Sequence, residues 1–113
     1  MSIPKAPNGA GTAGKRLWRA VLEAYELDEH ELSLLRQAVR SADLCDELQA
    51  VVDEEGPMVT TRLGEVKAHP AIVELRNQRI TLARLIVALR VPLGEQDEDR
   101  QQRRGIRGVY GAA

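Results

Sequence analysis

The sequence predicts a mainly helical protein with one small β-hairpin, and three observations support this class. Residues 27–55 keep a helical spacing of apolar side chains with neither glycine nor proline among them. A second unbroken helical pattern covers residues 70–91. The chain has 113 residues with no phenylalanine, one tryptophan and two tyrosines, so its core must be aliphatic, which suits helix packing better than a β-sandwich.

The first predicted helix covers residues 12–26 and follows a glycine- and proline-containing arm, residues 1–11, that we expect to be flexible. Thr12 is a candidate N-cap, and Lys15, Arg16 and Arg19 crowd the first half of the helix. Positive charge there opposes the helix macrodipole. These bases therefore form either a solvated face or a contact for phosphate groups. Trp18 is expected to anchor the core rather than to stack on a base.

The second predicted helix, residues 28–55, is the longest element. Asp28 can cap its start, and Gly56-Pro57 is typical of a helix end. Its apolar side chains spread over an arc wider than one small helical partner would cover. Two interpretations follow: an ordinary central bundle helix, or a helix that also contacts a neighbouring subunit. Cys45 lies on this arc and is expected to be a buried small residue, not a nucleophile.

A hairpin is predicted over residues 57–68, because β-prone residues flank a turn at Leu63-Gly64. An isolated hairpin is marginal in water, so this one should lie against the helices or pair with another subunit. His69 is expected to be structural.

Pro70 suits the first turn of the third predicted helix. That helix carries two heptad-spaced apolar lines, one of Leu75, Leu82 and Leu89 and the other of Val73, Ile80 and Val87, which suggests contacts on two sides. The residues chosen as the subunit interface are Leu34, Leu35, Ala38, Ala42, Leu75, Leu82, Ile86 and Leu89.

The net charge of −1 conceals segregation along the chain. Residues 1–22 carry +4, residues 23–55 carry −9, residues 56–92 carry +4, and residues 93–113 are balanced. Bases grouped in this way are compatible with a nucleic-acid partner. The domain scheme is an arm (1–11), a helical domain (12–92) and a charged tail (93–113). Candidate DNA contacts are Lys5, Lys15, Arg16 and Arg19, followed by Arg100, Arg103, Arg104 and Arg107.

Catalytic and metal-binding patterns are absent from the sequence. There is no phosphate-binding glycine loop, no combination of histidine, acid and nucleophile, and no zinc spacing, so we expect neither an enzyme nor a cofactor. A single cysteine excludes an intrachain disulfide. Neither a signal-peptide pattern nor a membrane-spanning run is present, and the expected location is therefore the cell interior, in solution.

The order of these features resembles the small terminase subunit family of tailed bacteriophages. The resemblance rests on the basic G-x-x-x-W segment from Gly14 to Trp18, the Leu27-Asp28-Glu29 start of the long helix, a hairpin bounded by Gly56 and Gly64, and His69-Pro70 opening the next helix. It covers residues 9–91. The chain departs from the family after Leu89, where an acidic run precedes the arginines.

The resemblance implies a ring-forming factor without enzymatic activity that acts in the cytoplasm of the host cell. Such a factor recognises double-stranded viral DNA, delivers it to the large terminase subunit, and regulates the ATPase and nuclease of that subunit. Two alternatives remain open on the sequence. One is a helical oligomeric adaptor that docks a protein, and the other is a small DNA-binding regulator with no packaging role.

Overall fold

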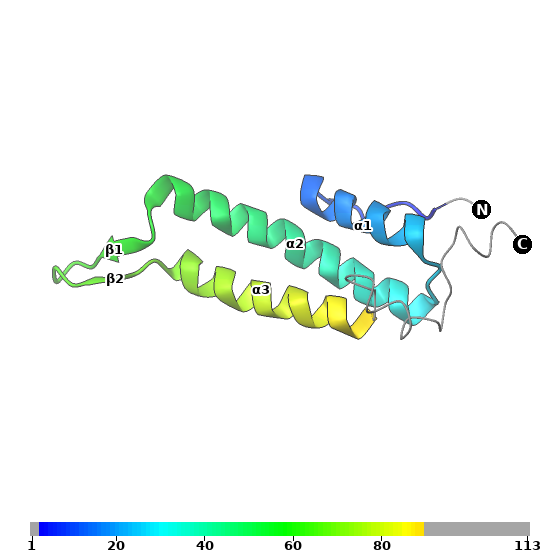
Figure 1. Ribbon diagram of the computed structural model, residues 1–113. Coiled ribbons are helices and arrows are strands. Elements are labelled where there is room, and N and C mark those ends of the chain that lie inside the picture. Colours follow the sequence, from blue (N-terminus) through cyan, green and yellow to red (C-terminus); the bar gives the residue numbers. More distant parts are fainter. Residues whose placement is uncertain (1–2, 90–113) are drawn as a thin grey trace, which may run out of the picture.

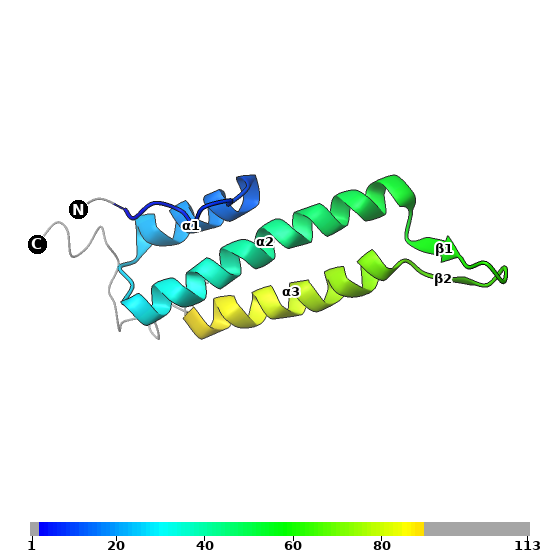
Figure 2. The same cartoon turned by 180° about the vertical axis from the view of Figure 1, so that it is seen from behind.

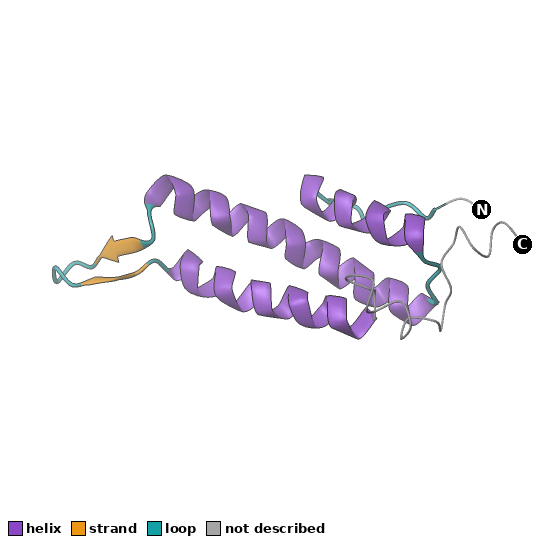
Figure 3. Cartoon of the chain, viewed as in Figure 1, coloured by secondary structure: helices purple, strands orange, loops and turns teal. Residues whose placement is uncertain are grey.

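The computed structural model describes residues 3–89, which form three helices and a two-stranded antiparallel hairpin. Helix α2 lies in the middle, with α1 along one side and α3 along the other (Figure 1, Figure 3). The hairpin extends from the end where α2 passes into α3, away from α1 (Figure 2). The predicted mainly helical class with a small hairpin is therefore confirmed.

Helix α1 runs from Thr12 to Ala24 and ends two residues earlier than predicted. Tyr25 has extended backbone angles (φ −136°, ψ 149°), which stop the helix. The N-cap is Gly11, so the expectation that Thr12 caps the helix is wrong; Thr12 is already the first helical residue. Gly11 has no side chain, so the cap must come from elsewhere in the fold.

Helix α2 runs from Glu29 to Glu55. Asp28 and Glu31 form a capping box at its start, in which the backbone N–H of Asp28 donates to Oε1 of Glu31 at 2.9 Å. At the other end Gly56 takes a positive φ of 84°, which favours glycine, and its N–H donates to the carbonyl of Val52. Both predicted ends of this helix are thus confirmed to within one residue.

Strands β1 (Met58–Thr60) and β2 (Val66–Ala68) form the hairpin, with Val59 paired to Lys67. The turn between them needs Gly64, whose φ is +85°. The backbone N–H of Gly64 donates to the carbonyl of Thr61 at 3.0 Å. Residues of both strands are largely exposed, so the expectation that the hairpin lies against the helices is not met within one chain.

Helix α3 runs from Pro70 to Leu89. His69 joins it to the base of the hairpin and the end of α2. Its Nδ1 accepts the backbone N–H of Ala71 (2.9 Å), and its Nε2 lies 2.8 Å from Oε1 of Glu55. The backbone N–H of His69 also donates to the carbonyl of Pro57 (2.8 Å). The structural role expected for His69 is therefore the one observed.

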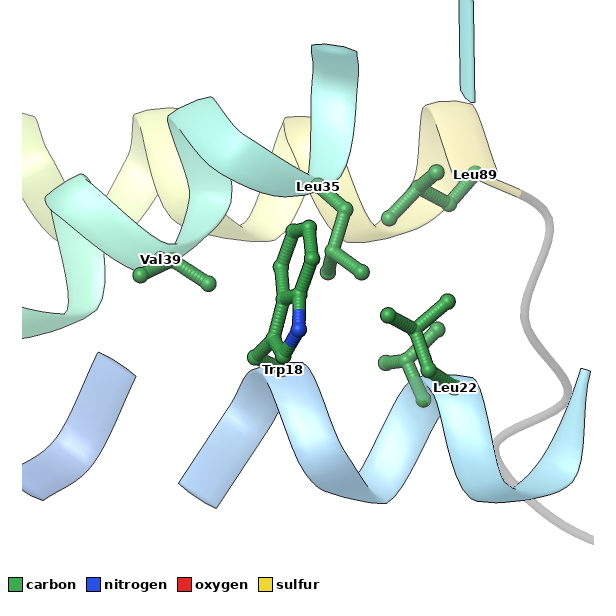
Figure 4. Close-up of a cluster of buried hydrophobic side chains, with 6 residues drawn as sticks. Trp18, Leu22, Leu35, Val39 and Leu89 are labelled. Carbon is green, nitrogen blue, oxygen red and sulfur yellow. The ribbon is translucent and has the colours of Figure 1, made fainter. Parts of the chain in front are cut away.

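The main core lies at the end of the molecule where all three helices meet. Its buried cluster contains Trp18, Val21, Leu22, Leu35, Val39 and Leu89 (Figure 4). Trp18 is 3% exposed, as expected of a core anchor. Four of the eight predicted interface residues are already buried within a single chain: Leu35, Ala38, Leu75 and Leu89.

The N-terminal segment is packed against the helices from Ile3 onward, whereas a flexible arm was expected. The indole N–H of Trp18 donates to the carbonyl of Pro4 at 2.8 Å. Ile3, Ala6 and Ala10 pack against the core cluster. The reason is that a buried indole needs a hydrogen-bond acceptor, and α1 cannot supply one from its own bonded carbonyls.

Candidate nucleic-acid interface

The basic side chains of α1 lie on one exposed face of the helix. Lys15, Arg16 and Arg19 are exposed and are spaced so that they fall on neighbouring turns. They line a groove of about 500 Å³ together with Thr12, Ala20 and Glu23. No ion pair within residues 3–89 involves any of the three bases. The sequence-predicted contacts on α1 are therefore brought together and accessible.

The N-terminus of α1 is already occupied by a carboxylate. Asp43 of α2 accepts the backbone N–H of Gly11 through Oδ2 and that of Gly14 through Oδ1, both at 2.7 Å. This supplies the cap that Gly11 lacks, and it places negative charge at the positive end of the helix. An approaching anion would therefore be bound by the lysine and arginine side chains rather than by free backbone N–H groups.

The structure explains why glycine occupies the first position of the G-x-x-x-W segment. A Cβ on Gly14 would clash with Oδ2 of Asp43 and lie 2.7 Å from Cγ1 of Val39, so only glycine allows this approach of α1 to α2. Trp18, one turn later, fills the space beyond. The two residues set the position of α1, while Lys15, Arg16 and Arg19 around them point to solvent.

Lys5 is exposed on the N-terminal segment. Its neighbours Pro4 and Ala6 line a second groove, which they share with Lys15, Trp18 and Arg19. The bond from Trp18 to Pro4 thus places the segment that carries Lys5 beside the basic face of α1. The other four candidates, Arg100, Arg103, Arg104 and Arg107, lie outside the described residues.

Asp43 was not predicted as a functional residue, because nothing in the sequence distinguishes it from the other acidic residues of α2. A signal was present in the sequence. A helix whose N-cap is glycine and whose first turn has no acidic residue needs a cap from outside, but the sequence does not tell which of many acids provides it.

Two other features could suggest chemical reactivity: a group of three side chains at the start of α2 and the lone thiol of Cys45. Asp28, His30 and Glu31 place possible ligand atoms within 4.8 Å of one another, but two of them form the capping box of α2. Cys45 is half-buried, and burial raises the pKa of its thiol, with Arg79 acting in the opposite direction. A thiol with a raised pKa is a weak nucleophile at neutral pH.

Comparison with known protein families, curated proteins and solved structures finds no significant match for this chain. Among residues 3–89, no helix combines the length and apolar character needed to cross a bilayer. The basic face of α1 is therefore the feature from which a function can be inferred.

Proposed function

We propose that this protein is a ring-forming small terminase subunit and that it binds double-stranded DNA through the basic face of α1. The observation that carries the proposal is the exposed group of Lys15, Arg16 and Arg19 on a helix whose position is fixed by Gly14, Trp18 and Asp43. Because the backbone of the helix is already held in place, only the side chains must be ordered when phosphates bind, which lowers the entropic cost of binding.

In this proposal the protein has no catalytic role. It assembles into a ring, binds viral DNA in the host cytoplasm, delivers the DNA to a large terminase subunit and regulates that subunit. Support for the packaging role comes from the order of sequence features from Gly14 to Pro70, and support for DNA binding comes from the α1 geometry. The two parts can be tested separately, since duplex DNA suffices for the second.

The test compares K15A/R16A/R19A with wild type in a titration of duplex DNA at several salt concentrations. Each phosphate contact contributes about 0.9 to the slope of log affinity against log salt, so the triple variant should lower that slope by about 2 to 3. Affinity at low salt should fall at least tenfold. The matched control, R62A/K67A/R79A, also removes three exposed bases, but from the hairpin and α3 rather than from α1, and should behave as wild type.

An affinity of K15A/R16A/R19A equal to that of wild type at matched salt would reject the α1 interface. A flat salt titration of the wild-type protein would reject DNA binding altogether. It would instead favour the protein-docking adaptor, for which the hairpin offers one supporting observation: Leu63 at its turn is 87% exposed, and Met58 and Val66 are at least half exposed.

A further inference from the structure

The side of α3 that faces away from α2 carries a regular apolar and basic pattern. Val73, Ile80 and Val87 repeat every seven residues and are 39%, 46% and 68% exposed. Arg76 and Arg84 lie between them on the same side and are exposed. Neither arginine forms an ion pair within the described part of the chain. We name these five residues the outer face of α3.

The second half of α2 carries a matching pattern with opposite charge. Leu44 and Val51 are spaced by seven residues, and Glu47 and Glu54 each follow by three, so all four lie along one side of the helix. Leu44 is half-buried, and the other three are exposed. We name them the acidic face of α2. Helix α1 lies beside the first half of α2, because its N-terminus is held at Asp43 (Figure 1).

These two faces cannot meet within one chain. Helix α3 contacts its own α2 through the opposite side, where Leu75 is buried and Gln78 accepts a hydrogen bond from Ser41. The outer face of α3 is therefore directed away from its own α2. Exposed apolar residues at heptad spacing are typical of a helix that packs against another helix.

We propose that the outer face of α3 binds the acidic face of α2 on a second copy of the same chain. Each face offers an apolar line with charges beside it, and the charges are of opposite sign. A two-fold contact between two α3 helices is disfavoured, because it would bring Arg76 and Arg84 of both copies together. Since the two faces of the contact differ, each copy keeps one of each kind free, and assembly continues to a closed ring or a filament.

The inference rests on the proposed assembly into a ring, and it names the surfaces that hold the ring together. The test measures native mass by light scattering for two charge-reversed variants, R76E/R84E and E47R/E54R. Each variant has two faces of like charge, so each should fall from the wild-type assembly toward the mass of a single chain, 12.5 kDa. Mixing the two variants in equal amounts lets them alternate with opposite charges at each contact between unlike variants, and the mass should rise well above that of a single chain.

A single chain carrying all four substitutions should also assemble, because its charges are exchanged rather than lost. The control R62E/K67E reverses two exposed bases on the hairpin and should keep the wild-type mass. Circular dichroism of each variant separates loss of contact from loss of fold.

Three results would overturn the inference. A wild-type protein that is monomeric at all concentrations would exclude the contact, while leaving DNA binding by α1 to its own test. Retention of the assembly by E47R/E54R would point to a contact that does not use α2. A mixture of the two variants that stays at the mass of a single chain would show that the two faces do not pair.

Discussion

The two ends of this molecule are built in different ways. At one end three helices and the N-terminal segment enclose a cluster in which Trp18, Leu22 and Leu35 are almost fully buried. At the other end only α2 and α3 pack together, and the hairpin beyond them is exposed. The side chains that position the basic face of α1 all belong to the first end. The proposed DNA contact therefore lies on the better packed part of the molecule, whereas the exposed hairpin lies on the other.

The largest expected effect is at Trp18. Replacing it with alanine opens a cavity between α1 and α2 and also removes the donor to Pro4. We expect W18A to lower the free energy of unfolding by about 3–5 kcal/mol, measured by urea denaturation followed by circular dichroism. W18F keeps an aromatic ring but loses the hydrogen bond and part of the buried volume of the indole, so its loss should be smaller, about 1–2 kcal/mol. Equal losses in the two variants would contradict the packing role of the ring.

A smaller effect is expected at Gly14. The added methyl group of G14A must displace the Asp43 carboxylate or Val39, so the cap of α1 weakens and the helix moves from α2. We expect a loss of about 1–3 kcal/mol in the free energy of unfolding. The control is A13G, which also exchanges glycine and alanine near the start of α1 but adds no atom between α1 and α2. A substitution at Gly9 would not serve as a control, because the positive φ of Gly9 strains any other residue there. A stability of G14A equal to wild type would show that the approach of the two helices is not needed.

The smallest effect is expected at His69, in the less packed end. H69A removes the acceptor for the Ala71 N–H and the contact with Glu55. The loss in unfolding free energy should be about 1 kcal/mol, and amide exchange should speed up in residues 57–72 while the Trp18 cluster keeps its protection. H69N retains a side-chain acceptor near Ala71 and should recover part of the loss. Faster exchange spread evenly over the chain would contradict the division into two ends.

Local chemistry explains what the sequence predicted well. Asp28 and Glu31 sit three residues apart before an apolar run, and Gly56-Pro57 follows one, so the limits of α2 depend on neighbouring residues only. The hairpin and the start of α3 at Pro70 follow from similar signals. The exposed α1 bases were predictable for the same reason: charged side chains on one side of an amphipathic helix stay in water.

Contacts between distant residues explain what the sequence did not predict. Asp43 caps a helix that begins 31 residues earlier, and Pro4 accepts a hydrogen bond from a residue 14 positions away. Neither pairing leaves a mark in residue spacing. The interface residues were hard to predict for a related reason. Helical periodicity identifies the apolar faces of a helix, but it does not say which of them packs within the same chain. Leu75 and Val73 belong to different faces of α3, and only the structure separates the covered one from the exposed one.

In the proposed complex the carboxylate of Asp43 also limits how many phosphates the basic row on α1 could reach. It marks one end of the basic row on α1, and Glu23 in the same groove marks the other. From Lys15 to Arg19 the helix rises about 6 Å, while phosphates of one strand follow each other every 3.4 Å or so along the duplex axis. The α1 row of a single copy would therefore reach about two or three phosphates and hold them weakly. Tight binding would come from many copies on one duplex, so that avidity, and with it the number of subunits, would determine how long the DNA stays bound.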